Sequence, residues 1–180
     1  HALYATYSAQ FGKFGVKPGT RFEYDDRTTR MDSAALADVS ELGFFPSLHA
    51  SYELPAQMQL MASYVRRIDR PRGWDLQPGR RRFDRYTAGE GNPGLKPEYI
   101  NSFELGWQVP LGSSRLSAET YLRGTENLIQ RVTTMDTIDP TLLVHRPENV
   151  GTDRSIGVEL LADLNPWKFL NVNLTGTAYD

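Results

Sequence analysis

Arginines and aromatic residues gather within one short stretch of the chain. The ligand-contact candidates are Arg72, Trp74, Arg80, Arg81, Arg82, Phe83, Arg85 and Tyr86, and Arg70 precedes them. A guanidinium group binds carboxylates and phosphates through two parallel hydrogen bonds, and aromatic rings stack on sugars or other rings. The stretch is therefore a candidate site for an anionic ligand or for lipopolysaccharide phosphates. The alternative is a solvated loop that Asp69, Asp75 and Asp84 partly neutralise.

Histidines, aspartates and possible nucleophiles elsewhere in the sequence lack the spacing that metal binding or catalysis requires. The three histidines His1, His49 and His145 do not have the spacing of metal ligands, and His49 is expected to line the polar face of the fold. Asp136 and Asp139 do not match a calcium-binding loop. The sequence contains no nucleophile elbow, phosphate-binding loop or dinucleotide fingerprint. We therefore expect no enzyme, no cofactor and no metal site.

Composition excludes several classes of protein. The net charge of -2 gives no bulk attraction to nucleic acid. The chain has no cysteine, which excludes disulfides and thiolate metal sites. The mean hydropathy of -0.48 resembles that of a soluble protein. A window average is blind, however, to a barrel wall in which only every second residue is apolar.

The elements that must position the arginine stretch follow a strict period of two. Ile156, Val158, Leu160, Ala162 and Leu164 fall on one face of an extended segment, with polar residues between them. Successive side chains of a β-strand point to opposite faces, so this pattern predicts strands.

Eight such segments are predicted. They cover residues 2–11, 14–25, 47–54, 58–69, 98–109, 115–132, 151–164 and 169 onward. Short turns alternate with long loops over residues 26–45, 70–97 and 134–147, and Pro18 indicates a bulge or a strand edge. Aromatic residues lie beside the short turns, namely Phe11, Phe14, Trp107, Trp167 and Phe169. Long strands with short turns at one end and long loops at the other are typical of outer-membrane barrels.

We therefore predict an all-β fold, an antiparallel meander of about eight long strands that forms part of a large transmembrane β-barrel. Two other folds fit the alternation. One is a complete eight-stranded barrel with a structural or adhesive role. The other is a soluble β-sandwich that binds carbohydrate and buries its apolar face.

Four segments carry a resemblance to a known family. Residues 91–99 read GNPGLKPEY, residues 62–71 read ASYVRRIDRP, residues 18–24 read PGTRFEY, and Asn149-Val150-Gly151 precedes Gly157-Val158-Glu159. In this order they resemble TonB-dependent outer-membrane receptors of the Bacteroidetes-type outer membrane β-barrel family. Pro18 and Thr20 depart from the family pattern without disturbing the alternation.

The resemblance implies the rest of the architecture and the function. Members have a barrel of about 22 strands around an N-terminal plug, lie in the outer membrane of Gram-negative bacteria, and import a scarce nutrient. The implied partners are outer-membrane lipid, the TonB complex acting through a plug absent from this sequence, a small-molecule or oligomeric nutrient, and a surface lipoprotein. Siderophores, haem, vitamins, oligosaccharides and peptides all remain open as cargo.

Both ends of the sequence lie within the alternating pattern, so we expect residues 1–180 to be an internal piece of a barrel domain. The outermost strands of such a piece carry unpaired backbone groups, which are costly in lipid. We expect it to fold stably only by pairing with further strands, by closing on itself or by forming oligomers.

Overall fold

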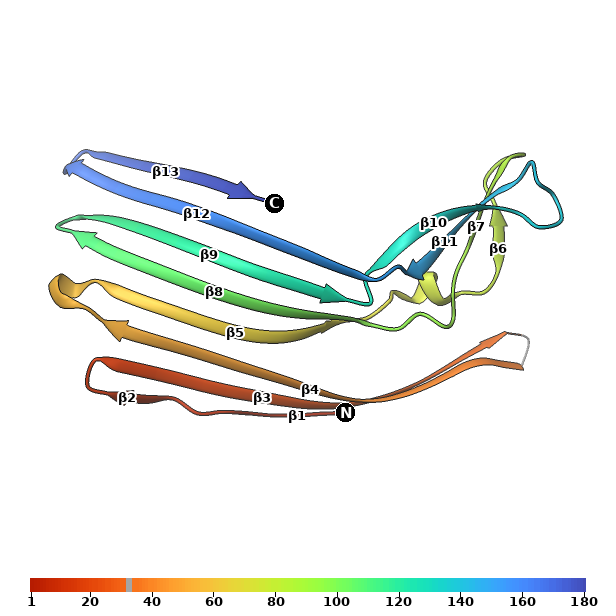
Figure 1. Ribbon diagram of the computed structural model, residues 1–180, viewed down its shortest axis with the longest axis horizontal. Coiled ribbons are helices and arrows are strands. Elements are labelled where there is room, and N and C mark those ends of the chain that lie inside the picture. Colours follow the sequence, from red (N-terminus) through yellow and green to blue (C-terminus); the bar gives the residue numbers. More distant parts are fainter. Residues whose placement is uncertain (32–33) are drawn as a thin grey trace.

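A computed structural model describes residues 1–31 and 34–180, and the side chains of residues 1–28 and 39–180. The molecule is built around one antiparallel sheet in the order β1-β3-β4-β5-β8-β9-β12-β13, with β2 paired to β3 (Figure 1). Its strands are β1 (Ala2–Thr6), β2 (Ala9–Phe11), β3 (Phe14–Met31), β4 (Ala34–Glu53), β5 (Gln59–Asp69), β8 (Glu98–Leu111), β9 (Ser114–Glu126), β12 (Thr152–Trp167) and β13 (Leu170–Tyr179). The predicted meander is confirmed.

The two faces of this main sheet differ as the alternation predicts. One row of paired residues runs across five neighbouring strands through Leu48, Tyr64, Phe103, Leu122 and Ile156. No second sheet covers this apolar face in the described part of the chain, and Phe103 remains 51% exposed. A soluble sandwich would bury such a row against another sheet, so that alternative is wrong.

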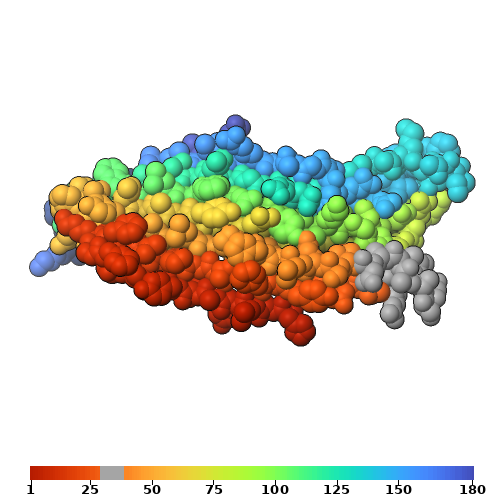
Figure 2. Space-filling view, turned by 60° about the horizontal axis from the view of Figure 1, so that its bottom comes forward, coloured from red at the N-terminus to blue at the C-terminus, as the bar shows by residue number. Residues whose placement is uncertain are grey.

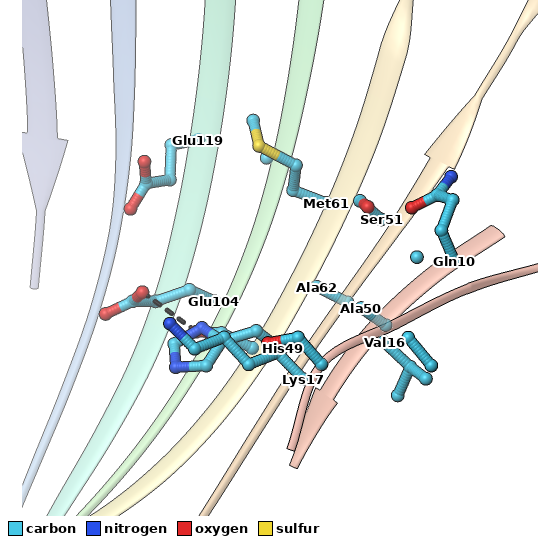
Figure 3. A pocket seen from close by; sticks show the side chains of 15 residues that line it. Gln10, Val16, Lys17, His49, Ala50, Ser51, Met61, Ala62, Glu104 and Glu119 are labelled. Atoms are coloured by element: carbon cyan, nitrogen blue, oxygen red, sulfur yellow. Dashed lines mark hydrogen bonds between the residues drawn. The ribbon is translucent and has the colours of Figure 1, made fainter. Parts of the chain in front are cut away.

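The opposite face is polar. Lys17, His49, Ser63 and Glu104 are paired in register on four neighbouring strands, β3, β4, β5 and β8. Together with Glu119 of β9 they line a hollow of about 430 Å³, and the Ser63 hydroxyl donates a hydrogen bond of 3.0 Å to Glu104 (Figure 3). His49 thus lies on the polar face, as expected.

Short turns join the strands at one end of the sheet. Gly12 and Gly112 open two-residue turns with φ of 61° and 62°, a conformation that glycine adopts without strain. The β4–β5 link is the 3₁₀ turn η1 (Pro55–Gln57). At the β12–β13 turn the rings of Trp167 and Phe169 stack with centroids 6.0 Å apart, on exposed side chains.

Three of the predicted strands and loops that belong to the main sheet differ in the structure. The loop predicted over 26–45 is instead strand through Met31 and from Ala34, because β3 and β4 stay paired far beyond the rest of the sheet; residues 32–33 lie outside the described residues. The strand predicted over 115–132 divides at Asn127, whose φ of 57° is left-handed. The strand predicted over 2–11 is interrupted between Thr6 and Ala9.

Pro18 explains that interruption. Its carbonyl accepts a hydrogen bond of 3.0 Å from the Tyr7 amide, so its ring nitrogen also faces the first strand. A proline nitrogen has no hydrogen to donate. The missing bond therefore falls where the first strand is interrupted. The register is the same on both sides, with Thr6 opposite Gly19 and Ala9 opposite Val16, and β3 lies between β1 and β4, so the predicted bulge or strand edge is wrong.

The two longest connections form a second sheet at the other end of the main sheet (Figure 1). Its order is β10-β11-β7-β6, with β6 (Arg80–Arg82), β7 (Thr87–Glu90), β10 (Ile129–Met135) and β11 (Leu143–Asn149). The predicted loops over 70–97 and 134–147 thus contain strands, and the first also contains the 3₁₀ turn η2 (Gly73–Leu76). We name this second sheet the loop sheet. None of the helical segments in the described residues is long and apolar enough to cross a membrane.

Candidate ligand site in the loop sheet

The loop sheet joins segments that are far apart in the sequence. β7 pairs with β11 in parallel, with Ala88 opposite Val144, and these two residues form a small buried core with Leu142. In the space-filling view the β10–β11 connection projects at the end of the molecule opposite the short turns (Figure 2). The core fixes the two connections against each other, so the side chains on their outer surfaces have defined positions.

Residues 91–99, which we name the GNP segment, lead from β7 of the loop sheet into β8 of the main sheet. The amides of Gly91 and Asn92 donate to the carbonyls of Gln77 and Asp75, at 3.0 and 2.6 Å. A Cβ atom on Gly91 would lie 2.2 Å from the Gln77 oxygen, so only glycine permits this approach. Leu95 is almost fully buried. These contacts fix the path of the connection that leads into β8.

Asn149 links the GNP segment to the corner between β9 and β10. Its Oδ1 accepts from the Lys96 amide at 2.9 Å, while its Nδ2 donates to the carbonyls of Lys96 and Asn127, at 3.0 and 2.7 Å. One amide side chain thus holds three backbone groups from two connections. The sequence placed Asn149 in a family motif but did not predict this link.

The alternation of β6 divides the predicted arginine cluster between two faces. Arg80 forms ion pairs with Glu90 at 3.0 Å and with Asp136 at 2.5 Å, and Arg82 lies 3.6 Å from Asp139. These carboxylates come from β7 and from the β10–β11 connection. Asp69, Asp75 and Asp84, the neutralising residues suggested from the sequence, form no ion pair with the cluster within the described residues.

The acidic partners are held by further hydrogen bonds. The amide of Asp139 and the guanidinium of Arg80 lower the pKa of Asp136, and the Asp136 and Glu90 carboxylates raise the pKa of Arg80. The Thr141 hydroxyl and amide lower the pKa of Asp139. This face of β6 is therefore neutralised and serves the structure of the loop sheet.

Arg81 points to the other face of β6. The register aligns it with Gly89 of β7 and His145 of β11, and Arg131 of β10 lies one row away. These four residues line a hollow of about 230 Å³ together with Trp74 and Phe83. Three of the predicted candidates, Trp74, Arg81 and Phe83, are thus brought together.

The other predicted candidates lie outside the hollow. Arg72 stacks on the ring of Trp74 at 5.3 Å from its centroid, and Arg85 stacks on Tyr86 at 5.6 Å. Arg70 is directed to the main sheet, where it pairs with Glu23 at 2.6 Å. The sequence analysis missed Arg131 and His145, because only the long-range pairing of the two connections brings them to Arg81.

The fold and the loop sheet define a class of protein. An open antiparallel wall with one apolar and one polar face, short turns at one end and structured loops at the other, is part of an outer-membrane β-barrel. The model of the outer membrane protein beta-barrel family matches residues 1–180, so the chain belongs to this family and lies in the outer membrane of Gram-negative bacteria. The resemblance seen in the sequence is confirmed.

Solved structures show the same fold. The chain is similar to the siderophore receptor PirA from Pseudomonas aeruginosa, with a TM-score of 0.71 and 19% identity over 99% of this chain and 31% of that chain. A mutant of the ferric enterobactin receptor PfeA from the same organism gives a TM-score of 0.72 and 19% identity, over 97% and 26%.

A mutant of the hemophore receptor HasR from Serratia marcescens, in complex with its hemophore HasA and heme, gives a TM-score of 0.78 and 16% identity, over 99% of this chain and 33% of that chain. The chain thus spans about a quarter to a third of the length of these receptors. A comparison with curated proteins finds no match.

Proposed function

We propose that residues 1–180 are an internal segment of the barrel of a TonB-dependent receptor, which imports a scarce nutrient across the outer membrane. The observation that carries this proposal is that one molecule combines an exposed apolar sheet face with an ordered, arginine-rich loop sheet at one end. The wall suits lipid contact, and the loop sheet suits ligand capture on the extracellular side, where long loops of such barrels lie.

The edges of the main sheet support a longer barrel. β1 and β13 lie at opposite edges, and no ladder joins them within the described residues. Each therefore has one row of backbone groups to pair with a further strand, since unpaired groups in lipid are costly. An eight-stranded barrel closed on itself would instead pair β1 with β13.

The partners follow from the two faces. Outer-membrane lipid covers the apolar face, and the plug of the full protein packs against the polar face and couples it to the TonB complex. A small-molecule or oligomeric nutrient binds from outside, and a surface lipoprotein is a further candidate partner at the loop sheet.

The first test is the sequence of the parent gene on both sides of this segment. The proposal expects a signal peptide and a plug domain upstream and further alternating strands downstream. Start and stop codons close to the two ends would overturn it in favour of a small barrel.

The second test is uptake. Cells lacking the parent gene are expected to lose energy-dependent accumulation of one member of a panel of labelled siderophores, haem, cobalamin and oligosaccharides. Exchanging residues 72–86 for a Gly/Ser linker of equal length should reduce that uptake. An exchange of the turn Pro55–Gln57 for a Gly-rich turn is the control, because it lies at the opposite end of the sheet. Unchanged uptake in the linker variant would contradict a ligand role of this stretch.

A further inference from the structure

We propose that the hollow on the Arg81 face of the loop sheet binds an anionic group carried on a planar ring. Arg81 and Arg131 would bind the anion, and Trp74 and Phe83 would hold the ring. This inference rests on the proposed function and names the chemical class of ligand that the receptor captures.

Arg81 and Arg131 differ from other arginines of the loop sheet because no carboxylate pairs with them within the described residues. On the opposite face, the ion pairs already described satisfy Arg80 and Arg82, and Arg146 lies 3.7 Å from Glu90. Arg81 and Arg131 have no ion-pair partner within the described residues. Their guanidinium groups are exposed and free to bind an anion bidentately.

The acidic residues at the hollow leave this charge in place. Glu90 belongs to the lining, but its carboxylate binds Arg80 and Arg146. Asp75 is the other acid in the lining. Its backbone amide donates to Arg72 and its backbone carbonyl accepts from Asn92, while its carboxylate forms no ion pair within the described residues. Two arginines thus face one uncommitted carboxylate.

The aromatic residues provide ring surface that remains open to a ligand, although Arg72 stacks on one face of Trp74. Trp74 and Phe83 remain 63% and 61% exposed, although they are anchored at their backbones by η2 and by the hydrogen bond of 3.0 Å from the Phe83 amide to Thr87. The Phe83 ring packs over Gly89, where a Cβ atom would lie 2.7 Å from the ring. Exposed rings held in fixed positions favour stacking on a flat ligand.

His145 completes the lining as a fixed polar group. Its Nδ1 lies 2.8 Å from the Thr133 hydroxyl, which orients the ring and leaves Nε2 available to the hollow. The volume of about 230 Å³ is below the range of about 300–1,000 Å³ for complete drug-sized ligands. The hollow therefore fits one ring with its anionic substituent, which is one arm of a larger nutrient.

The test uses the purified full-length protein and phenyl phosphate, titrated by calorimetry. Inorganic phosphate, which lacks the ring, and benzyl alcohol, which lacks the charge, should each bind at least tenfold more weakly. Arg81→Ala and, on a separate strand, Arg131→Ala should each weaken phenyl phosphate binding at least about tenfold, the loss expected from one charge-assisted contact. Arg82→Ala is the matched control, since this adjacent arginine of β6 lies on the opposite face; its binding should stay within about twofold of the wild type.

Absence of phenyl phosphate binding to the wild-type protein would overturn the inference, as would equal losses in the Arg81→Ala and Arg82→Ala variants. Either result leaves the proposed receptor function standing if uptake still depends on the parent gene. Loss of the proposed function would appear separately, as unchanged uptake of every nutrient when the gene is deleted.

Discussion

Replacing Asn149 should release the GNP segment from the corner of β9 and β10. The variant Asn149→Ala removes the three hydrogen bonds to Lys96 and Asn127, of 2.7 to 3.0 Å. A net contribution of about 0.5–1.5 kcal/mol per bond gives a gross range of about 1.5–4.5 kcal/mol. Because the two bonds to Lys96 are exposed to water, we expect local destabilisation of about 1.5–3 kcal/mol.

Native-state hydrogen exchange of the full-length protein measures this directly. The amides of residues 91–96 other than Pro93 should exchange about 10- to 150-fold faster in the variant, since about 1.4 kcal/mol corresponds to a tenfold change. Asn149→Asp should be at least as harmful, because it places a carboxylate oxygen against two carbonyls. Asn173→Ala, which removes an exposed bond to Asn171, is the control. Exchange of the Lys96 amide within twofold of the wild type would refute the link.

Three further changes test other parts of the structure. Gly91→Ala should destabilise the contact between the GNP segment and Gln77 by about 2–4 kcal/mol, because its Cβ would meet backbone atoms of Gln77. Gly79→Ala is the control, since its Cβ would meet nothing within 4 Å. Limited proteolysis of the 72–91 connection should accelerate only in the first variant. The lowered pKa of Asp136 means that its contribution to stability is complete above about pH 4 and is lost as the pH falls through the lowered value. Protection of the amides in residues 136–142, taken relative to their intrinsic exchange rate at each pH, should therefore fall on acidification in the wild type and depend less on pH in Asp136→Asn, and identical profiles would contradict the ion pair with Arg80. Leu105→Arg, on the apolar face, should reduce folding stability in bilayers by about 2–4 kcal/mol, while Gln108→Arg, on the polar face, should change it by less than about 1 kcal/mol; urea titration in vesicles distinguishes the two.

The wall of the barrel was predictable because one physical constraint acts on every strand. Lipid on one side and a polar interior on the other enforce alternation, and the pattern around Phe103, Leu105 and Trp107 reports it directly. The constraint ends above the lipid. Residues 25–30 read Asp-Asp-Arg-Thr-Thr-Arg, polar on both faces, so the sequence indicated a loop although the ladder between β3 and β4 continues.

The candidate site was predictable only in part. Arg81, Trp74 and Phe83 stand close together in the sequence, and the exposed rings beside arginines indicated a ligand surface. The division of the arginines between two faces depends on Asp136 and Asp139, which another connection contributes. The place of Arg131 likewise follows from the pairing of β10 with β11 and of β11 with β7, and no local pattern encodes such long-range register.

The central claim is that the apolar face of the main sheet faces lipid and the polar face lines a barrel interior. The chain contains no cysteine, so single cysteines from residue 103 to 108 can carry spin labels in the full-length protein, once any cysteine elsewhere is replaced. In vesicles, accessibility to oxygen should peak at Phe103, Leu105 and Trp107. Accessibility to a water-soluble nickel chelate should peak at Glu104, Gly106 and Gln108. A reversed pattern, or accessibility without a period of two, would contradict the account.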